Sequence, residues 1–165
     1  MERRELFSFL SSSVKEAVSN NKDETVIIRP PYFIDKDAFA TECQNCEAQC
    51  ASLCQEQIII IGEDKTPYLD FSKRGCTYCD ECALGCPSDV LLVENKSKIV
   101  ANIVINRDKC LSWQGVMCFS CKDPCFEEAI DFKAMFMPEI NEKCTNCGFC
   151  IGRCPADAID IKKVS

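Results

Sequence analysis

Short runs of apolar residues, each bounded by turn-forming residues, recur along most of this chain. Such runs between turn signals are typical of buried β-strands. The most apolar run is Ile58 to Ile61, and the turn Gly62-Glu63-Asp64 follows it. The pattern predicts strands at residues 58–61, 68–71, 90–93, 129–132, 139–140 and 158–161.

The first twenty residues follow a different pattern, in which apolar side chains recur at helical spacing. These side chains are Leu6, Phe7, Leu10, Val14, Ala17 and Val18. We predict an amphipathic N-terminal helix that packs on the rest of the chain, with insertion into a partner's groove as the alternative. A polar linker at 20–24, a short strand at 25–28 and an extended segment at Pro30-Pro31 are expected to follow.

Sixteen cysteines lie between the apolar segments, in four runs of four with none left over. Run one is Cys43, Cys46, Cys50 and Cys54; run two is Cys76, Cys79, Cys82 and Cys86; run three is Cys110, Cys118, Cys121 and Cys125; run four is Cys144, Cys147, Cys150 and Cys154. An apolar segment follows every run, which indicates an internal repeat. We predict an α+β fold built from strand-helix-strand repeats around the cysteines.

Run four has the spacing of a bacterial 4Fe-4S ferredoxin motif, C-x2-C-x2-C-x3-C followed by Pro155. Three thiolates on one tight loop can reach three iron atoms of a cluster. In ferredoxins the fourth thiolate comes from the partner motif. Four runs therefore predict four 4Fe-4S clusters, held by all sixteen cysteines.

A proline follows the last cysteine of runs two and four, whereas Gln55 and Phe126 stand at that position in runs one and three. This alternation favours two tandem bacterial 2[4Fe-4S] ferredoxin-like modules over a nested arrangement of the motif pairs, which the spacing leaves open. The predicted units are residues 1–30 (helix and linker), 31–98 (runs one and two) and 99–165 (runs three and four). The tandem ligand sets are Cys43, Cys46, Cys50 and Cys86; Cys76, Cys79, Cys82 and Cys54; Cys110, Cys118, Cys121 and Cys154; and Cys144, Cys147, Cys150 and Cys125.

Disulfides and zinc are the other uses of clustered cysteines. Disulfides would explain the number of cysteines but not their order, because neighbours three residues apart would have to pair across runs. Zinc sites typically use two separated C-x2-C pairs, whereas three cysteines per run are bunched here. The chain contains no histidine, which rules out histidine-ligated haem, Rieske centres and histidine acid–base catalysis.

The chain has a formal net charge of −7, and each cluster with four thiolates adds about −2. We therefore expect no binding to nucleic acid. The aliphatic runs are too short to span a membrane. Arg3 and Arg4 faintly resemble a twin-arginine signal, but the polar stretch from Ser11 to Glu16 stands where an apolar region would follow, so we expect the protein to stay in the cytoplasm.

Taken together, the motifs resemble the NapF family of ferredoxin-type proteins of periplasmic nitrate reductase systems. The resemblance covers most of the chain. Two of its features lie before run one, namely the arginine pair without an export signal and the segment Arg29-Pro30-Pro31-Tyr32. The other two are the alternating prolines and the stretched third run. In that run seven residues, 111–117, separate Cys110 from Cys118. Run one is also longer than usual, since three residues separate Cys46 from Cys50, and a relaxed loop there could make its cluster labile or three-iron.

The resemblance implies a cytoplasmic iron-sulfur protein that contacts the catalytic subunit of the periplasmic nitrate reductase before export. Its role would be electron transfer, maturation of that subunit's 4Fe-4S cluster, or both. A general ferredoxin-type electron carrier, or the wiring subunit of another oxidoreductase, is the alternative, and a structural zinc protein is a third. We expect no enzyme activity of its own, because every cysteine is assigned as a ligand and no phosphate-binding glycine loop is present. Tyr78, Trp113 and Phe149 are interpreted as shields of the clusters rather than as electron-path residues.

Overall fold

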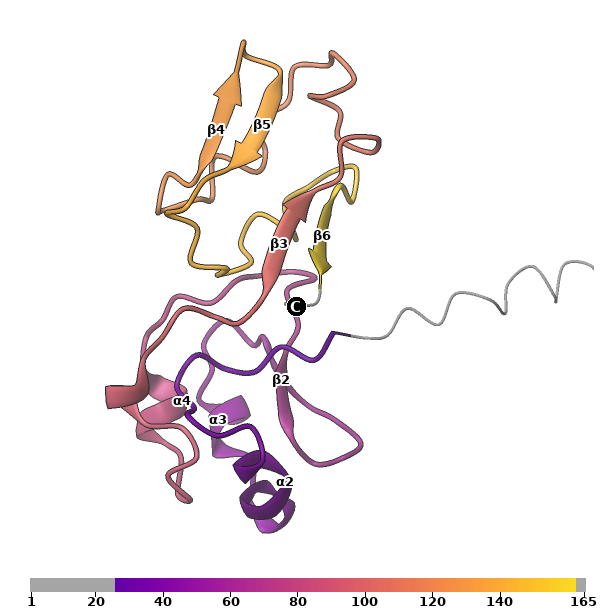
Figure 1. Cartoon of the computed structure of the whole chain (residues 1–165). Coiled ribbons are helices and arrows are strands. Elements are labelled where there is room, and N and C mark those ends of the chain that lie inside the picture. Colours follow the sequence, from indigo (N-terminus) through magenta and orange to yellow (C-terminus); the bar gives the residue numbers. More distant parts are fainter. Residues whose placement is uncertain (1–25, 163–165) are drawn as a thin grey trace, which may run out of the picture.

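The structure, a computed structural model, describes residues 26–162 (Figure 1). The predicted N-terminal helix lies outside this range. The helices are α2 (Ala38–Glu42), α3 (Gln49–Ser52) and α4 (Glu81–Leu84), with single 3-10 turns at Cys43–Asn45 and Val93–Asn95. The strands are β1 (Ile59–Ile61), β2 (Pro67–Leu69), β3 (Asn102–Ile105), β4 (Ile130–Lys133), β5 (Met137–Ile140) and β6 (Ile159–Lys162).

The strands form three separate antiparallel pairs, β1 with β2, β4 with β5, and β3 with β6. The first two pairs are hairpins, and in the β1–β2 turn the hydroxyl of Thr66 donates a hydrogen bond to Asp64 across 2.7 Å. The third pair joins segments far apart in sequence, with Ile103 opposite Ile161. Figure 1 shows β3 and β6 between the helical part of the molecule and the β4–β5 hairpin.

The strand predictions at 58–61, 68–71, 129–132, 139–140 and 158–161 are confirmed within two residues. The prediction at 90–93 is wrong, and no strand forms over 26–28, the described part of the strand predicted at 25–28. Residues 90–93 do lie beside the segment around Tyr32, because the N–H of Leu92 donates to the carbonyl oxygen of Tyr32 across 2.9 Å. A ladder does not form there because Pro30 and Pro31 have no N–H to donate.

Strand β3 was not predicted, although its sequence, Asn-Ile-Val-Ile, is a good strand former. The expected strand-helix-strand pattern is also only half correct. All three described helices precede residue 85, and residues 102–162 contain none. In run four, Gly152 stands at the position that Leu84, the last residue of α4, occupies in run two, and glycine is a poor helix former.

Two groups of buried apolar side chains divide the described chain. The first core contains Ile28, Tyr32, Phe39, Cys50, Ile58, Ile59, Leu69, Phe71, Cys82, Ala83, Val90, Leu91, Ile99 and Ala101. The second contains Ile103, Ile130, Cys150 and Ile159. We call residues 26–101 the N-terminal half and residues 102–162 the C-terminal half. Cysteines are members of both cores, so the space around them must be filled for the cores to be complete.

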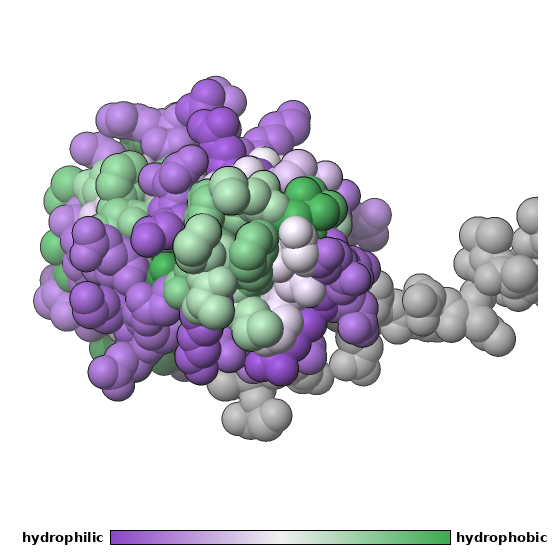
Figure 2. All heavy atoms as spheres, turned by 90° about the horizontal axis from the view of Figure 1, so that it is seen from above, coloured by the Kyte–Doolittle hydropathy of each residue, from purple (hydrophilic) through white to green (hydrophobic). Residues whose placement is uncertain are grey.

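Much of the surface is hydrophilic, and Figure 2 shows a hydrophobic area (green) that interrupts it on one face. Among the exposed large apolar side chains are Leu84, Met117 and Phe126, the last with 81% of its surface exposed. Within residues 26–162, no helix is both long and apolar enough to cross a membrane.

Candidate iron-sulfur sites

Four cavities in the structure are each lined by four cysteines. The first contains Cys43, Cys46, Cys50 and Cys86; the second Cys54, Cys76, Cys79 and Cys82; the third Cys110, Cys118, Cys121 and Cys154; and the fourth Cys125, Cys144, Cys147 and Cys150. Every set takes three cysteines from one run and the last cysteine of the neighbouring run. The structure thus gathers the cysteines in the sets of the tandem scheme, whereas a nested scheme would need Cys54 beside run four. Their assignment as ligands stays a prediction.

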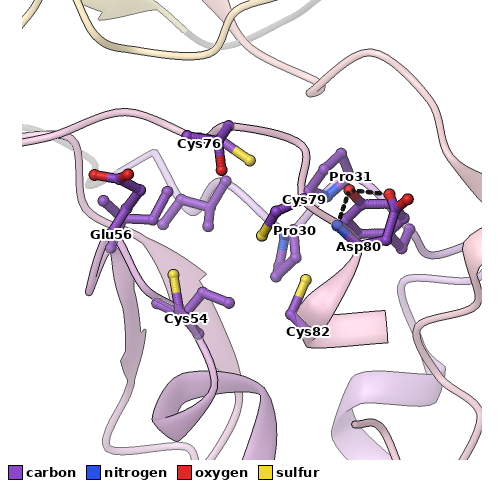
Figure 3. A pocket seen from close by; sticks show the side chains of 13 residues that line it. Pro30, Pro31, Cys54, Glu56, Cys76, Cys79, Asp80 and Cys82 are labelled. Atoms are coloured by element: carbon purple, nitrogen blue, oxygen red, sulfur yellow. Dashed lines mark hydrogen bonds between the residues drawn. The ribbon is translucent and has the colours of Figure 1, made fainter. Parts of the chain in front are cut away.

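The cavities are alike in size and lining. Their volumes, counting the part open to solvent, are about 310, 370, 350 and 350 Å³ from the first to the fourth. In the second cavity, the sulfur atoms of Cys54, Cys76, Cys79 and Cys82 point into the same space (Figure 3). Ile58, Ile59 and Leu69 close its apolar side, so a group held there is largely shielded from water.

The backbone has the same conformation after each of the four runs. The third residue beyond the last cysteine has a positive φ in every case: Gln57 (55°), Asp89 (54°), Glu128 (49°) and Asp157 (45°). Such a value is uncommon outside glycine. This bend sends the chain from the cavity wall into the apolar segment that follows. The fourfold recurrence shows that the sequence repeat is also a structural repeat.

The structure also shows where the longer first run places its extra residue. Asp80 and Gly148 have positive φ values two residues before the third cysteine of runs two and four, and Ala48 has one two residues before Cys50. The additional residue therefore lies between Cys46 and Ala48. All four cysteines of run one line a cavity, three in the first and Cys54 in the second.

The stretched third run folds back on itself. The N–H of Gln114 donates to the carbonyl oxygen of Cys110 across 3.1 Å, and the Trp113 indole N–H donates to that of Pro138 in β5 across 3.2 Å. The guanidinium of Arg107 lies 4.3 Å from the Trp113 ring centre, a cation–π distance. The inserted loop is thus held against β5, and Cys110 still lines the third cavity with Cys118 and Cys121.

Burial raises the pKa of several of these thiols. The pKa of Cys82 and of Cys150 rises to about 12, and that of Cys50, Cys76 and Cys121 to about 11, in each case chiefly by burial and further by neighbouring cysteines. A buried thiolate is costly unless a positive charge accompanies it. The iron ions of an iron-sulfur cluster would supply that charge, because thiolates are the ligands of such clusters.

Backbone N–H groups point at some of the sulfur atoms. The N–H of Ala129 donates to Cys125 Sγ and that of Ala158 to Cys154 Sγ, each across 3.3 Å. The N–H of Tyr78 donates to Cys76 Sγ across 3.4 Å. Such hydrogen bonds stabilise negative charge on sulfur and are among the features that set the reduction potential of a cluster.

The geometry differs from that of a site for one ion. Within residues 26–162, no three Cys, Asp or Glu side chains converge closely enough to hold a single metal ion. Tetrahedral zinc would draw four sulfur atoms to about 2.3 Å from one point. Sulfur atoms arranged around a void instead fit a polynuclear group such as a 4Fe-4S cluster.

These features define a ferredoxin-type iron-sulfur protein, and comparisons with known proteins agree. The model of the 4Fe-4S binding domain family matches residues 138–160. The ferredoxin-type protein NapF of Escherichia coli strain K12 is 33% identical over 137 residues, which cover 80% of this chain and 82% of that protein. The chain belongs to the NapF family of ferredoxin-type proteins.

Two relatives from Haemophilus influenzae are also similar. Its ferredoxin-type protein NapF is 29% identical over 95% of this chain and 91% of its own length. Its ferredoxin-type protein NapG is 29% identical over 84% of this chain and 59% of its own length. The resemblance to NapF inferred from the cysteine runs is thereby confirmed.

Sequence reasoning missed several residues that organise the cavities. The guanidinium of Arg29 donates to Thr66 Oγ1 across 2.7 Å and to the carbonyl oxygen of Pro67 across 2.6 Å, and it lies 4.8 Å from the Phe39 ring centre. Phe39 and Pro67 both line the first cavity. Arg29 thus connects the Arg-Pro-Pro-Tyr motif to that cavity, a role that a sequence pattern does not reveal.

Proposed function

We propose that the chain holds four 4Fe-4S clusters, one in each cavity, in two tandem ferredoxin-like modules at residues 31–98 and 99–165. The ligands are the four cysteine sets that line the cavities, so each cluster takes three thiolates from one run and one from its partner. The observation that supports this assignment best is the recurrence, four times, of the same three-plus-one arrangement of cysteines.

A 4Fe-4S cluster supplies a one-electron carrier when it is bound. The residues of the chain do the rest. The thiolates bind the iron, the N–H groups of Ala129 and Ala158 stabilise charge on two of the sulfur atoms, and apolar side chains such as Ile58 and Leu69 restrict water. No proton donor or nucleophile is needed for this function.

Iron and acid-labile sulfide, quantified on protein purified without oxygen, test the cofactor assignment. We expect about sixteen iron atoms and as many sulfides per chain. A colourless protein that contains zinc and no sulfide would overturn the proposal. A Cys118→Ser variant is the matched control, because it should lose the iron of the third cavity alone.

We further propose that the protein acts in the cytoplasm on the catalytic subunit of the periplasmic nitrate reductase before that subunit is exported. Two roles fit the chemistry, namely electron transfer to that subunit and maturation of its iron-sulfur cluster. Membership of the NapF family supports this proposal. Affinity purification with the cluster-loaded protein should recover the cytoplasmic precursor of that subunit, and deletion of the protein should lower the iron content and activity of the reductase.

A general electron carrier is the second candidate. The observation that favours it is that four cluster-sized cavities lie within one small chain. Clusters in these cavities could pass electrons along the chain whichever protein is the final acceptor. Stopped-flow reduction by cellular donors separates the two candidates. Equal electron delivery to unrelated acceptors, with no preference for the reductase precursor, would favour the general carrier.

A further inference from the structure

Runs two and four, which belong to different halves, are in direct backbone contact. The N–H of Cys76 donates a hydrogen bond to the carbonyl oxygen of Cys147 across 2.7 Å. Cys76 lines the second cavity and Cys147 the fourth. These two cavities are therefore separated, along this line, only by two cysteine side chains and the peptide groups that the hydrogen bond joins.

Further hydrogen bonds surround this contact. The amide of Asn146, a buried residue, donates to the carbonyl oxygens of Ile99 and Ala101, each across 2.9 Å. The Tyr78 hydroxyl donates to the carbonyl oxygen of Thr145. The loop of run four is thus fixed both to run two and to the segment that connects the halves, so its position is determined by several bonds at once.

Glycines permit this close approach. A Cβ atom on Gly75 would lie 2.5 Å from the backbone nitrogen of Phe149, and one on Gly152 would lie 2.7 Å from the carbonyl oxygen of Lys73. Backbone atoms cannot swing aside as a side-chain end can. Because neither glycine has a positive φ, the local backbone would accept alanine, and the obstacle is the opposite half.

The other neighbouring cavities lie within the halves. Run one lines both the first cavity, with Cys50, and the second, with Cys54 four residues later. Run four likewise lines both the fourth cavity, with Cys150, and the third, with Cys154. Each half therefore contains one pair of adjacent cavities, and the contact between Cys76 and Cys147 connects the two pairs.

We infer that the contact between run two and run four is the route by which the two halves exchange electrons, with Gly75 and Gly152 as positioning residues. This inference rests on the proposed four-cluster function. Under this inference, an electron passes between the cavities in the order first, second, fourth, third. In each exchange one electron leaves the group in one cavity and enters the group in the other, so that one is oxidised and the other reduced, while every thiolate stays bound and no proton moves.

The test begins with a variant that keeps only the second and fourth sites, Cys46→Ser with Cys118→Ser. After reduction with dithionite we expect about eight iron atoms and an EPR spectrum broadened by spin coupling between the halves. Adding Gly152→Ala should abolish the broadening without loss of iron. The matched control is Gly85→Ala, which also lies near a cysteine but whose Cβ would come too close only to the flexible end of the Leu53 side chain, while the nearest backbone atom, the carbonyl oxygen of Glu81, lies at an ordinary contact distance of 3.4 Å.

A second measurement does not depend on the double variant. In the otherwise unchanged protein, Gly152→Ala should speed hydrogen exchange at the Cys76 amide and remove part of the EPR broadening, whereas Gly85→Ala should change neither. Spin coupling between the halves that persists in Gly152→Ala would overturn the inference. So would the absence of this coupling from the Cys46→Ser, Cys118→Ser double variant when its two remaining sites are full of iron. Either result would leave the proposed function intact. Absence of iron from the unchanged protein would instead overturn the proposed function.

Discussion

The hydroxyl of Tyr78 in run two donates a hydrogen bond to the carbonyl oxygen of Thr145 in run four across 2.5 Å. The same hydroxyl accepts a hydrogen bond from the N–H of Ile99 across 3.1 Å. One phenol group thus satisfies backbone groups on two segments that are distant in sequence. Burial raises the pKa of Tyr78 to about 12, so the hydroxyl keeps its proton at neutral pH.

Replacement of Tyr78 by phenylalanine should destabilise the protein by about 1–3 kcal/mol, because it leaves a carbonyl oxygen and an N–H without their partner. Denaturant unfolding of the cluster-loaded protein without oxygen would measure the loss. Tyr68→Phe is the control, since the Tyr68 hydroxyl makes no hydrogen bond with another group among residues 26–162. Equal stability of the two variants would contradict the importance of the Tyr78 hydroxyl.

Replacement of Cys54 by serine should remove the iron of the second cavity, although Cys54 belongs to run one. Iron should fall by about four atoms from about sixteen. Alkylation followed by mass spectrometry should find Cys76, Cys79 and Cys82 newly reactive. Reactivity at Cys144, Cys147 and Cys150 instead would indicate nested pairing and would refute the ligand sets proposed above.

Cluster loading should become more favourable as the pH rises from 7 to 8.5. Burial holds the pKa of Cys82 and Cys150 near 12, above the ordinary thiol value, so both carry a proton across this range before iron binds. Ligation requires thiolate and must release that proton, and a higher pH lowers the cost of release. Proton release can be followed with an indicator dye during anaerobic reconstitution, and loading that is independent of pH would contradict this reasoning.

Replacement of Arg29 by lysine should weaken the first cavity. Lysine lacks the planar donor group that reaches Thr66 and Pro67 together, and it stacks less well on Phe39. We expect faster loss of about four iron atoms per chain to a chelator, with the remaining iron unaffected. The control is Arg74→Lys, because Arg74 is largely exposed and its ion pair with Glu56 spans 3.6 Å. Identical loss rates would show that Arg29 does not support this cavity.

Complete removal of iron should unfold much of the protein. Among residues 26–162, the second core has four buried apolar members, and one of them is Cys150. Without clusters the cavities would leave the cores incomplete, so the free energy of metal binding is expected to contribute directly to folding. Circular dichroism before and after anaerobic treatment with a chelator and an oxidant tests this, and an unchanged spectrum would count against it.

Local features of the sequence were sufficient for several conclusions. The C-x2-C-x2-C spacing of run four identifies a 4Fe-4S motif because three ligands lie on one loop, within reach of local backbone geometry. The strands β1, β4 and β6 follow from apolar segments between turns. The strand predicted at 90–93 is absent, because Pro30 and Pro31 on the neighbouring segment have no N–H groups to donate to a β-ladder.

The sequence by itself determined the class of chemistry, the number of motifs and the resemblance to the NapF family, since these depend on residue type and spacing. Only the tertiary structure decided which run supplies the fourth cysteine of each cavity and that Cys76 lies against Cys147. The spacing between runs is compatible with tandem and nested pairing alike, so nothing local selects between them. Contacts between distant segments make that selection, and they form where glycine and buried hydrogen bonds allow two backbones to meet.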